Sequence, residues 1–197
     1  ASAFKKPTAL ESELYYFSEG NLSYDSSRAN ETQPKFNWGS EEIRKRLVEG
    51  KASIIAKGLS TPFQLDGWRL AAAGAIGKNR MDDYNHEVLN LVRNTMDNSN
   101  PDSLLIGDFG SDSVVQVQGG NFSSILSYSN FTKPTWSWLW NTKQNKEEAK
   151  MGLGRKSISG DQFRQAHNCQ SGTTPWHLRM HALNALDTYE TGRFKTF

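Results

Sequence analysis

The clearest helical signal in this chain lies at residues 40–58, which read SEEIRKRLVEGKASIIAKG. Ser40 can cap the first turn with its hydroxyl, and the two glutamates that follow it suit the positive end of a helix dipole. Apolar residues recur at near-helical spacing from Ile43 onward, Gly50 weakens the middle, and Gly58 provides a stop. We therefore predict a helix over 40–58 and infer a mainly α-helical fold from it.

Three further helices are expected. The first spans 61–77, because proline follows threonine at its start and suits the first helical position. The second is capped by Asp82 or Asp83 and keeps its apolar residues on one face as far as Met96. The last spans 174–190 and opens with another Thr-Pro pair.

Downstream of the first helices the hydrophobic period becomes strand-like. Leu104–Ile106 and Val114–Val117 predict short strands bounded by glycines. Trp136–Trp140 would place three tryptophans on one face if this segment is extended. The fold class that follows is mainly α with short strands and much irregular structure. We expect a small α-helical domain over 40–197, preceded by an extended arm over 1–39.

Two segments, 22–58 and 126–160, show weak sequence similarity to each other. Leu22-Ser-Tyr24 recurs as Leu126-Ser-Tyr128, and a Glu-Glu pair leads to a Gly-x-x-Ser-Ile run in both. A duplication would give two similar modules. Chance matching in a restricted alphabet of residues is the alternative explanation.

Composition excludes several classes of protein. The 197 residues carry 23 basic and 21 acidic side chains, so the formal net charge of +2 argues against a strongly cationic nucleic-acid-binding protein. The mean hydropathy is −0.67, and no apolar run approaches the roughly 18 residues that a membrane span needs. One cysteine cannot form an internal disulfide. A start at Ala1 without methionine suits a processed precursor, which leaves the compartment unknown and a plastid suspected.

Aromatic residues in segments rich in Gly and Ser are the most unusual feature. Large aromatic side chains outside long periodic elements must become buried, either in a small core or against a partner. Single-stranded nucleic acid could also stack on them, but the low net charge argues against it. The candidates for contact with protein partners are Tyr15, Tyr16, Phe17, Tyr24, Phe36, Trp38, Trp136, Trp138 and Trp140.

Two motifs resemble nucleotide-handling signatures and are rejected. Ile106–Gly110 contains the Asp-Phe-Gly of protein kinases, but the chain is too short for a kinase and lacks the other signatures, so we interpret it as a turn between strands. Gly74–Lys78 approaches a phosphate-binding loop. Ala72 and Asn79 stand where that loop needs glycine and a hydroxyl residue.

Cys169 could serve as a nucleophile if a histidine acted as its base. His177 and His181 are four residues apart on the predicted last helix, and they could also bind zinc with His167 or Cys169. Because Cys169 lies in a turn-like stretch and no family signature surrounds it, we expect an ordinary thiol and no catalytic or metal site. No cofactor is expected, although covalent attachment of a prosthetic group to Cys169 is chemically feasible.

One resemblance to a known family exists. Glu11-Ser-Glu-Leu14 and Gly20-Asn-Leu-Ser23 resemble elements in the repeat domain of the linker polypeptides of the phycobilisome, a photosynthetic antenna. The resemblance implies a non-enzymatic linker subunit that anchors to other protein subunits of a large complex, without nucleic acid and without a transmembrane segment. The loop-borne aromatic residues would supply the anchors.

Three other functions stay open at this point. The chain could be a small hydrolase or transferase that depends on Cys169 and a histidine, or a minor structural protein of a viral particle. It could also be a secreted glycoprotein, because four Asn-x-Ser/Thr sequons occur, at Asn21, Asn30, Asn121 and Asn130. We take the structural linker as the leading hypothesis.

Overall fold

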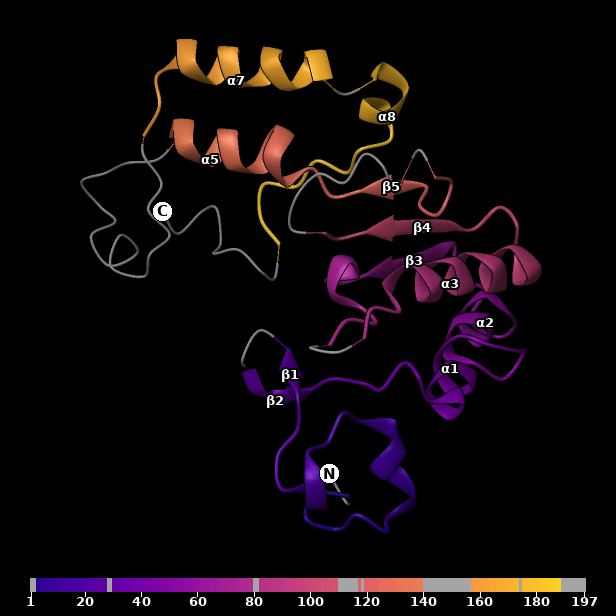
Figure 1. Cartoon of the computed structure of the whole chain (residues 1–197). Helices are drawn as coiled ribbons and strands as arrows, with labels where there is room; N and C mark the ends of the chain where they lie inside the picture. Colours follow the sequence, from indigo (N-terminus) through magenta and orange to yellow (C-terminus); the bar gives the residue numbers. More distant parts are fainter. Residues whose placement is uncertain are drawn as a thin grey trace. The chain divides into compact units, whose positions relative to one another are not determined.

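A computed structural model describes residues 3–27, 30–79, 82–109, 117, 119–139, 157–173 and 175–188 (Figure 1). The chain divides into two compact units. Unit 1 comprises the described residues of 1–68 and 72–105, and unit 2 those of 69–71 and 106–197. The described residues form helices and a few short strands, which confirms the expectation of helices together with short strands. No helix in the described ranges is long and apolar enough to cross a membrane.

Short elements and ring contacts fold the N-terminal residues of unit 1. Two 3₁₀ turns, η1 (Leu10–Leu14) and η2 (Glu19–Asn21), precede an antiparallel pair of strands, β1 (Ser26–Ser27) and β2 (Asn30–Pro34). The buried amide of Asn21 donates to the Ala3 carbonyl at 2.9 Å and to the hydroxyl of Ser12 at 2.9 Å. A separate extended arm that ends at residue 39 stays a prediction.

The single helix predicted over 40–58 is wrong, because two helices occupy this stretch. They are α1 (Glu41–Leu47) and α2 (Ile54–Leu59). Between them, Gly50 adopts a φ of 77°, a left-handed conformation that glycine tolerates and that interrupts a right-handed helix. The Ser53 hydroxyl then accepts from the Ala56 amide at 3.2 Å and caps α2. Ser40 precedes α1 as predicted, but its side chain makes no capping hydrogen bond.

These two serines allow a matched test of capping. Ser53→Ala should lower the free energy of unfolding by about 1 to 2 kcal/mol, because it removes a buried cap and leaves an amide unpaired. Ser40→Ala should change it by less than about 0.5 kcal/mol, since the Ser40 hydroxyl is buried without a hydrogen-bond partner. Urea denaturation followed by circular dichroism measures both values. Equal losses of unfolding free energy in the two variants would contradict the assignment of Ser53, and not Ser40, as a helix cap.

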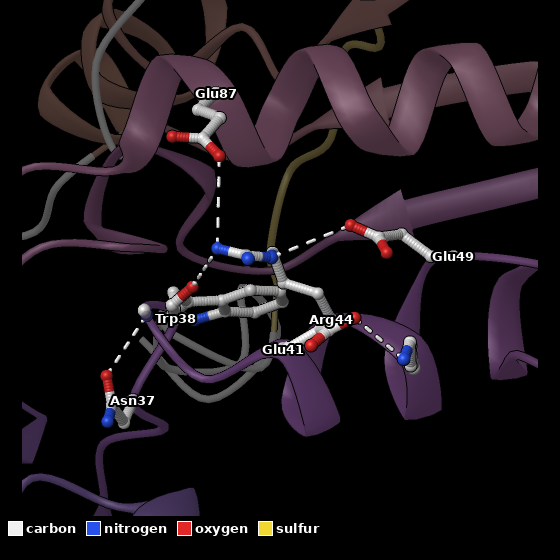
Figure 2. Close-up of polar contacts among 8 residues, drawn as sticks. Asn37, Trp38, Glu41, Arg44, Glu49 and Glu87 are labelled. Atoms are coloured by element: carbon white, nitrogen blue, oxygen red, sulfur yellow. Dashed lines mark hydrogen bonds and ion pairs between the residues drawn. The ribbon is translucent and has the colours of Figure 1, made fainter.

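Arg44 connects α1 with α3 (Asn85–Ser99), the longest helix of unit 1 (Figure 2). Its guanidinium donates to the Trp38 carbonyl at 3.2 Å and lies 3.9 Å from Glu87 and 3.6 Å from Glu49. Figure 2 shows the Arg44 side chain between these two carboxylates, beside the indole of Trp38. The apolar core of the unit includes Ile43, Val48, Ile55, Val88, Leu89 and Met96.

A strand replaces the helix that the sequence predicts over 61–77. The observed elements are β3 (Gly67–Leu70) and a 3₁₀ turn, η3 (Ala73–Ala75). The indole of Trp68 packs where Gly58 carries no side chain, and its Nε1 donates to the Ile55 carbonyl at 3.2 Å. Pairing and packing with residues far along the chain outweigh the local helix signals here.

The helix predicted with its apolar face as far as Met96 is confirmed as α3, but it begins at Asn85 and its N-cap residue is Tyr84, so the prediction of Asp82 or Asp83 at that position is wrong. Asp83 precedes it, and its carboxylate accepts from the Asn85 amide at 3.1 Å. That hydrogen bond, with a further contribution from Lys78, lowers the pKa of Asp83 below its usual 3.8.

The depressed pKa of Asp83 makes the stability of unit 1 depend on pH. A group whose pKa is lower in the folded than in the unfolded state contributes stability above the unfolded value, and this contribution is lost as the pH falls through the folded value. Asp83→Asn should therefore flatten the loss of stability below about pH 4. Urea midpoints from acid to neutral pH test this expectation, and an unchanged slope would contradict it.

Three strands form one parallel sheet, in the order β3-β4-β5 (Figure 1). β4 (Leu104–Gly107) confirms the strand predicted at 104–106, whereas 114–116 lie outside the described residues. β5 (Ser124–Ile125) pairs with β4 in parallel, with Ile106 opposite Ser124. Backbone bonds from Leu104 to Asp66 and from Asp108 to Leu70 advance in the same direction, so β3 is parallel too.

The helices of unit 2 correct three further predictions. A π-helical turn, η4 (Tyr128–Thr132), leads into α5 (Lys133–Leu139), so the tryptophan segment is helical and not extended. α7 (Gly160–Thr173) forms where a turn around Cys169 was expected. α8 (Trp176–Met180) is much shorter than the predicted helix over 174–190. After α8 the chain is extended, and Leu183 forms a parallel bridge with Leu126, next to β5.

Candidate functional site

A polar cluster in unit 2 lies where the parallel strands end. Asp108 directly follows β4, Arg69 belongs to β3, Tyr128 lies three residues after β5, and Thr188 follows the extended segment at Leu183. The Asp108 carboxylate forms an ion pair with the Arg69 guanidinium and accepts from the Tyr128 hydroxyl at 3.3 Å. We call Arg69, Asp108, Tyr128 and Thr188 the strand-end cluster.

The hydrogen bonds of this cluster have a defined order of donors and acceptors. The Tyr128 hydroxyl lies 3.0 Å from the Thr188 hydroxyl as well as 3.3 Å from Asp108. Because a phenol has one proton and the carboxylate can only accept, Tyr128 donates to Asp108 and accepts from Thr188. The chain of bonds therefore runs from Thr188 through Tyr128 to the buried carboxylate.

Burial makes the charge on Asp108 costly unless it is compensated. Its side chain is completely buried, whereas the Arg69 side chain is 33% exposed. A buried carboxylate without a partner would lose its hydration, so the Arg69 ion pair and the Tyr128 hydrogen bond replace water around it. Solvent reaches the cluster through the exposed part of Arg69.

The position of the cluster is the usual one for an active site in this type of sheet. In parallel α/β folds, ligands bind beyond the carboxyl ends of the strands, where the residues after several strands meet. A carboxylate there can bind a hydroxyl group, transfer a proton or stabilise a developing positive charge. Among the described residues no group of three acidic, histidine or cysteine side chains could hold a metal ion.

The predicted partner-binding aromatics of the N-terminal segment contact one another. Tyr15 stacks on Phe36, with ring centroids 5.4 Å apart, and meets Phe17 edge to face at 6.1 Å. Phe17 also meets Tyr24 edge to face, at 6.2 Å. Burial, with a contribution from the charge of Asp82, raises the pKa of Tyr16 above 10.0. Partner binding by these residues stays a prediction.

The predicted tryptophan contacts are dispersed. Trp38 is half-buried next to Arg44 in unit 1. Trp136 is buried on α5, and its indole donates to the Leu186 carbonyl. Trp138, 44% exposed, stacks on Phe163 of α7 at 4.9 Å. Trp140 lies outside the described residues.

Cys169 is exposed on α7, away from any turn. A shallow depression beside it is lined by Asp161, Arg164, Gln165 and Asn168, and no described residue of its lining is a histidine. His167 stacks on Phe163, and His181 lies in the turn after α8. That Cys169 is an ordinary thiol without an attached prosthetic group stays a prediction.

The strand-end cluster was not predicted from the sequence. Asp108 was expected in a turn without a function, and Arg69 inside a helix. Two signals were present: an acidic residue directly after the apolar run Leu104–Gly107, and an arginine within the apolar stretch around Trp68. The partnership of Arg69 with Asp108 spans 39 residues and depends on the pairing of β3 with β4, so neither signal predicts it alone.

Comparison with known proteins shows which folds this chain resembles. No family model matches it. It is 22% identical to a cyclomaltodextrinase from a Bacillus species over 178 aligned residues. The alignment covers 90% of this chain and 27% of that protein. It is 24% identical over 110 residues to a maltogenic alpha-amylase from Bacillus acidopullulyticus, covering 56% of this chain and 17% of that protein.

Solved structures give the same result. A debranching enzyme from Nostoc punctiforme matches 98% of this chain with a TM-score of 0.72 and 21% identity, over 39% of its own length. A cyclomaltodextrinase matches 98% with a TM-score of 0.72, over 30% of its length. The chain shares its fold with a part of each of these enzymes. It spans less than two-fifths of each of these relatives.

These similarities overturn the leading hypothesis from the sequence. The resemblance to phycobilisome linkers is wrong, and so are the predictions of a non-enzymatic structural subunit and of a role in photosynthesis, because the relatives and structural neighbours are carbohydrate-hydrolysing enzymes. Of the residues behind that resemblance, Glu11–Leu14 lie in η1 and Gly20 and Asn21 in η2, whereas Leu22 and Ser23 follow η2. The comparisons support neither the Cys/His enzyme nor the viral structural protein.

Proposed function

We propose that this chain acts on α-glucans as part of a glycoside hydrolase, and that the substrate meets the strand-end cluster. The buried carboxylate of Asp108 carries this proposal, because it follows a parallel strand at the edge where such folds bind ligands. The names of the relatives supply the substrate class, since they act on cyclomaltodextrins and related α-glucans.

The order of elements supports a finer description of the fold. β3, α3 and β4 form a strand–helix–strand unit, and β5 and the segment at Leu183 continue the parallel pairing. Repeats of this unit build α/β barrels, in which residues at the strand ends contact the substrate. We propose that the chain is a sector of such a barrel, in place of the small helical domain with an arm.

Hydrolysis of a glycosidic bond ordinarily requires two carboxyl groups on either side of that bond. In the ion pair with Arg69, Asp108 is a carboxylate anion, which suits the group that stabilises positive charge at the sugar's anomeric carbon. Asp187 is the positional candidate for the second group, because it adjoins Thr188, whose hydroxyl contacts Tyr128. In this role Asp187 would protonate the leaving oxygen.

Release of reducing ends from maltoheptaose and a cyclomaltodextrin tests this proposal. Asp108→Asn keeps the shape of the side chain but removes its charge, so we expect at least about a hundredfold loss of activity. Asp161→Asn is the matched control, since Asp161 is 89% exposed on α7 and should leave the rate unchanged. Full activity in Asp108→Asn would reject Asp108 as the catalytic carboxylate.

Binding of α-glucans without cleavage is the second candidate function. One observation favours it: the residues directly after β3, β4 and β5 are Ala71, Asp108 and Leu126, so Asp108 alone is acidic at these three positions. A binding protein would be retarded in a glycogen-containing gel, would release no reducing ends, and would lose retardation in Asp108→Asn.

A further inference from the structure

A cavity of about 220 Å³ in unit 2 lies between α8, α7, η4 and β5. None of the described residues that line it belongs to the strand-end cluster. We propose that this cavity is a second carbohydrate site, which holds one glucosyl ring of an α-glucan against Trp176. The choice of ligand class rests on the proposed function, whereas the site itself rests on the geometry that follows.

Trp176 provides an exposed aromatic surface at the cavity. Trp176 is 67% exposed. The Arg179 guanidinium lies over one face of its ring, 5.2 Å from the centre, so a sugar would pack on the opposite face. A pyranose ring carries C–H groups on its faces and hydroxyls around its edge. Packing such a face on an indole removes apolar surface of both partners from water while the hydroxyls stay available for hydrogen bonds.

The polar groups of the lining suit a neutral polyhydroxyl ligand. Asn130 and Asn184 carry amides, which both donate and accept as sugar hydroxyls do, and Ser127 adds a hydroxyl-bearing side chain. No carboxylate occurs among the described lining residues and Arg179 carries a positive charge there, so nothing in this wall favours a cation; the Arg179 guanidinium lies over the Trp176 ring. Phe131, Met180 and Ile125 are among the apolar residues of the wall. A few placed polar groups in a largely apolar cavity are typical of small-ligand sites.

The size of the cavity limits the ligand to a single ring. Its volume is below the range of about 300 to 1,000 Å³ that is common for larger organic ligands. Trp176 and Met180 are 67% and 63% exposed, so the rest of a glucan chain can continue past them into solvent.

Ring stacking fixes the wall on the α7 side. His167 lines the cavity and stacks on Phe163 with centroids 6.2 Å apart, and Phe163 stacks on Trp138 at 4.9 Å. The two interplanar angles are 22° and 17°, so each pair of neighbouring rings is nearly parallel. A side chain held in this way loses little freedom when a ligand binds, which favours affinity.

Fluorine NMR of the protein labelled with 5-fluorotryptophan tests the site directly. The six tryptophans give separate signals, and Trp176→Phe identifies that of Trp176 by its loss. The probe is a maltotetraose with sulfur in its linkages, which resists hydrolysis. We expect the Trp176 signal to shift on titration while that of buried Trp136 stays in place. Asn184→Ala should weaken the affinity measured at Trp176 by about tenfold.

Phe63→Ala is the matched control, because Phe63 is also 67% exposed but belongs to unit 1. It should leave the titration at Trp176 unchanged. Absence of a shift at Trp176, in protein whose hydrolysis depends on Asp108, would overturn this inference and leave the proposed function intact. A shift at Trp176 without hydrolysis would support the site and reject the hydrolase. An equal shift with inorganic phosphate or with a β-linked tetrasaccharide would reject the α-glucan as its ligand.

Discussion

Asp108→Ala should lower the free energy of unfolding by about 3 kcal/mol. Removing one partner of a buried ion pair leaves the other charge without compensation, which ordinarily costs about 3 to 5 kcal/mol. The lower end applies here because the Arg69 side chain is 33% exposed and can regain water. The Tyr128 hydroxyl also loses the carboxylate to which it donates. Urea denaturation monitored by circular dichroism measures the loss.

A double variant separates the ion pair from the packing around it. Arg69→Met with Asp108→Leu removes both charges and keeps apolar volume, so it should recover at least half of the stability that Asp108→Ala loses. The double variant should have no hydrolytic activity, since the carboxylate is absent. Equal stability of the single and double variants would show that volume, and not the unpaired charge of Arg69, determines the loss.

Gly67→Ala should prevent β3 from pairing normally and cost about 3 kcal/mol or more. A Cβ atom at Gly67 would lie 2.0 Å from the Leu104 carbonyl oxygen and 2.8 Å from the Leu104 backbone nitrogen. Backbone atoms of a paired strand cannot move aside as a flexible side chain can, so the two strands must separate. Thermal unfolding should show a fall in Tm of several degrees.

Gly172→Ala is the matched control for this substitution. Gly172 lies in α7, and no heavy atom lies within 4 Å of the position that its Cβ would take. Alanine should therefore raise stability by up to about 1 kcal/mol, because glycine is a poor helix former. A loss in Gly172→Ala comparable to that in Gly67→Ala would mean that the loss at Gly67 is not caused by contact with Leu104.

Helix α3 and strand β4 could be predicted because their signals are local. The apolar positions of α3 recur on one face from Val88 to Met96, and β4 is an apolar run that ends at a glycine. β3 could not be predicted in this way, because the Thr61-Pro62 pair before it and the alanines after it favour a helix. The close approach of Gly67 to Leu104 and the packing of Trp68 on Gly58 decide its conformation.

The candidate site could not be predicted from the sequence either, because it also depends on contacts between distant residues. Cys169 and the histidines were weighed as candidates because their residue types are chemically reactive. Cys169 and His167 lie on α7, however, and His181 lies in a turn. Asp108 and Arg69 are ordinary residue types 39 positions apart, and only the parallel pairing of their strands makes them an ion pair.

The sequence by itself determined the length and near-neutral charge of the chain, the helix over 85–99 and the strand at 104–107, since these depend on composition and on the period of nearby residues. The tertiary structure alone decided that 67–70 is a strand, that 160–173 is a helix and that Asp108 is buried against Arg69. Strand pairing and charge burial depend on contacts between distant residues, and the free energy of those contacts exceeds local preference.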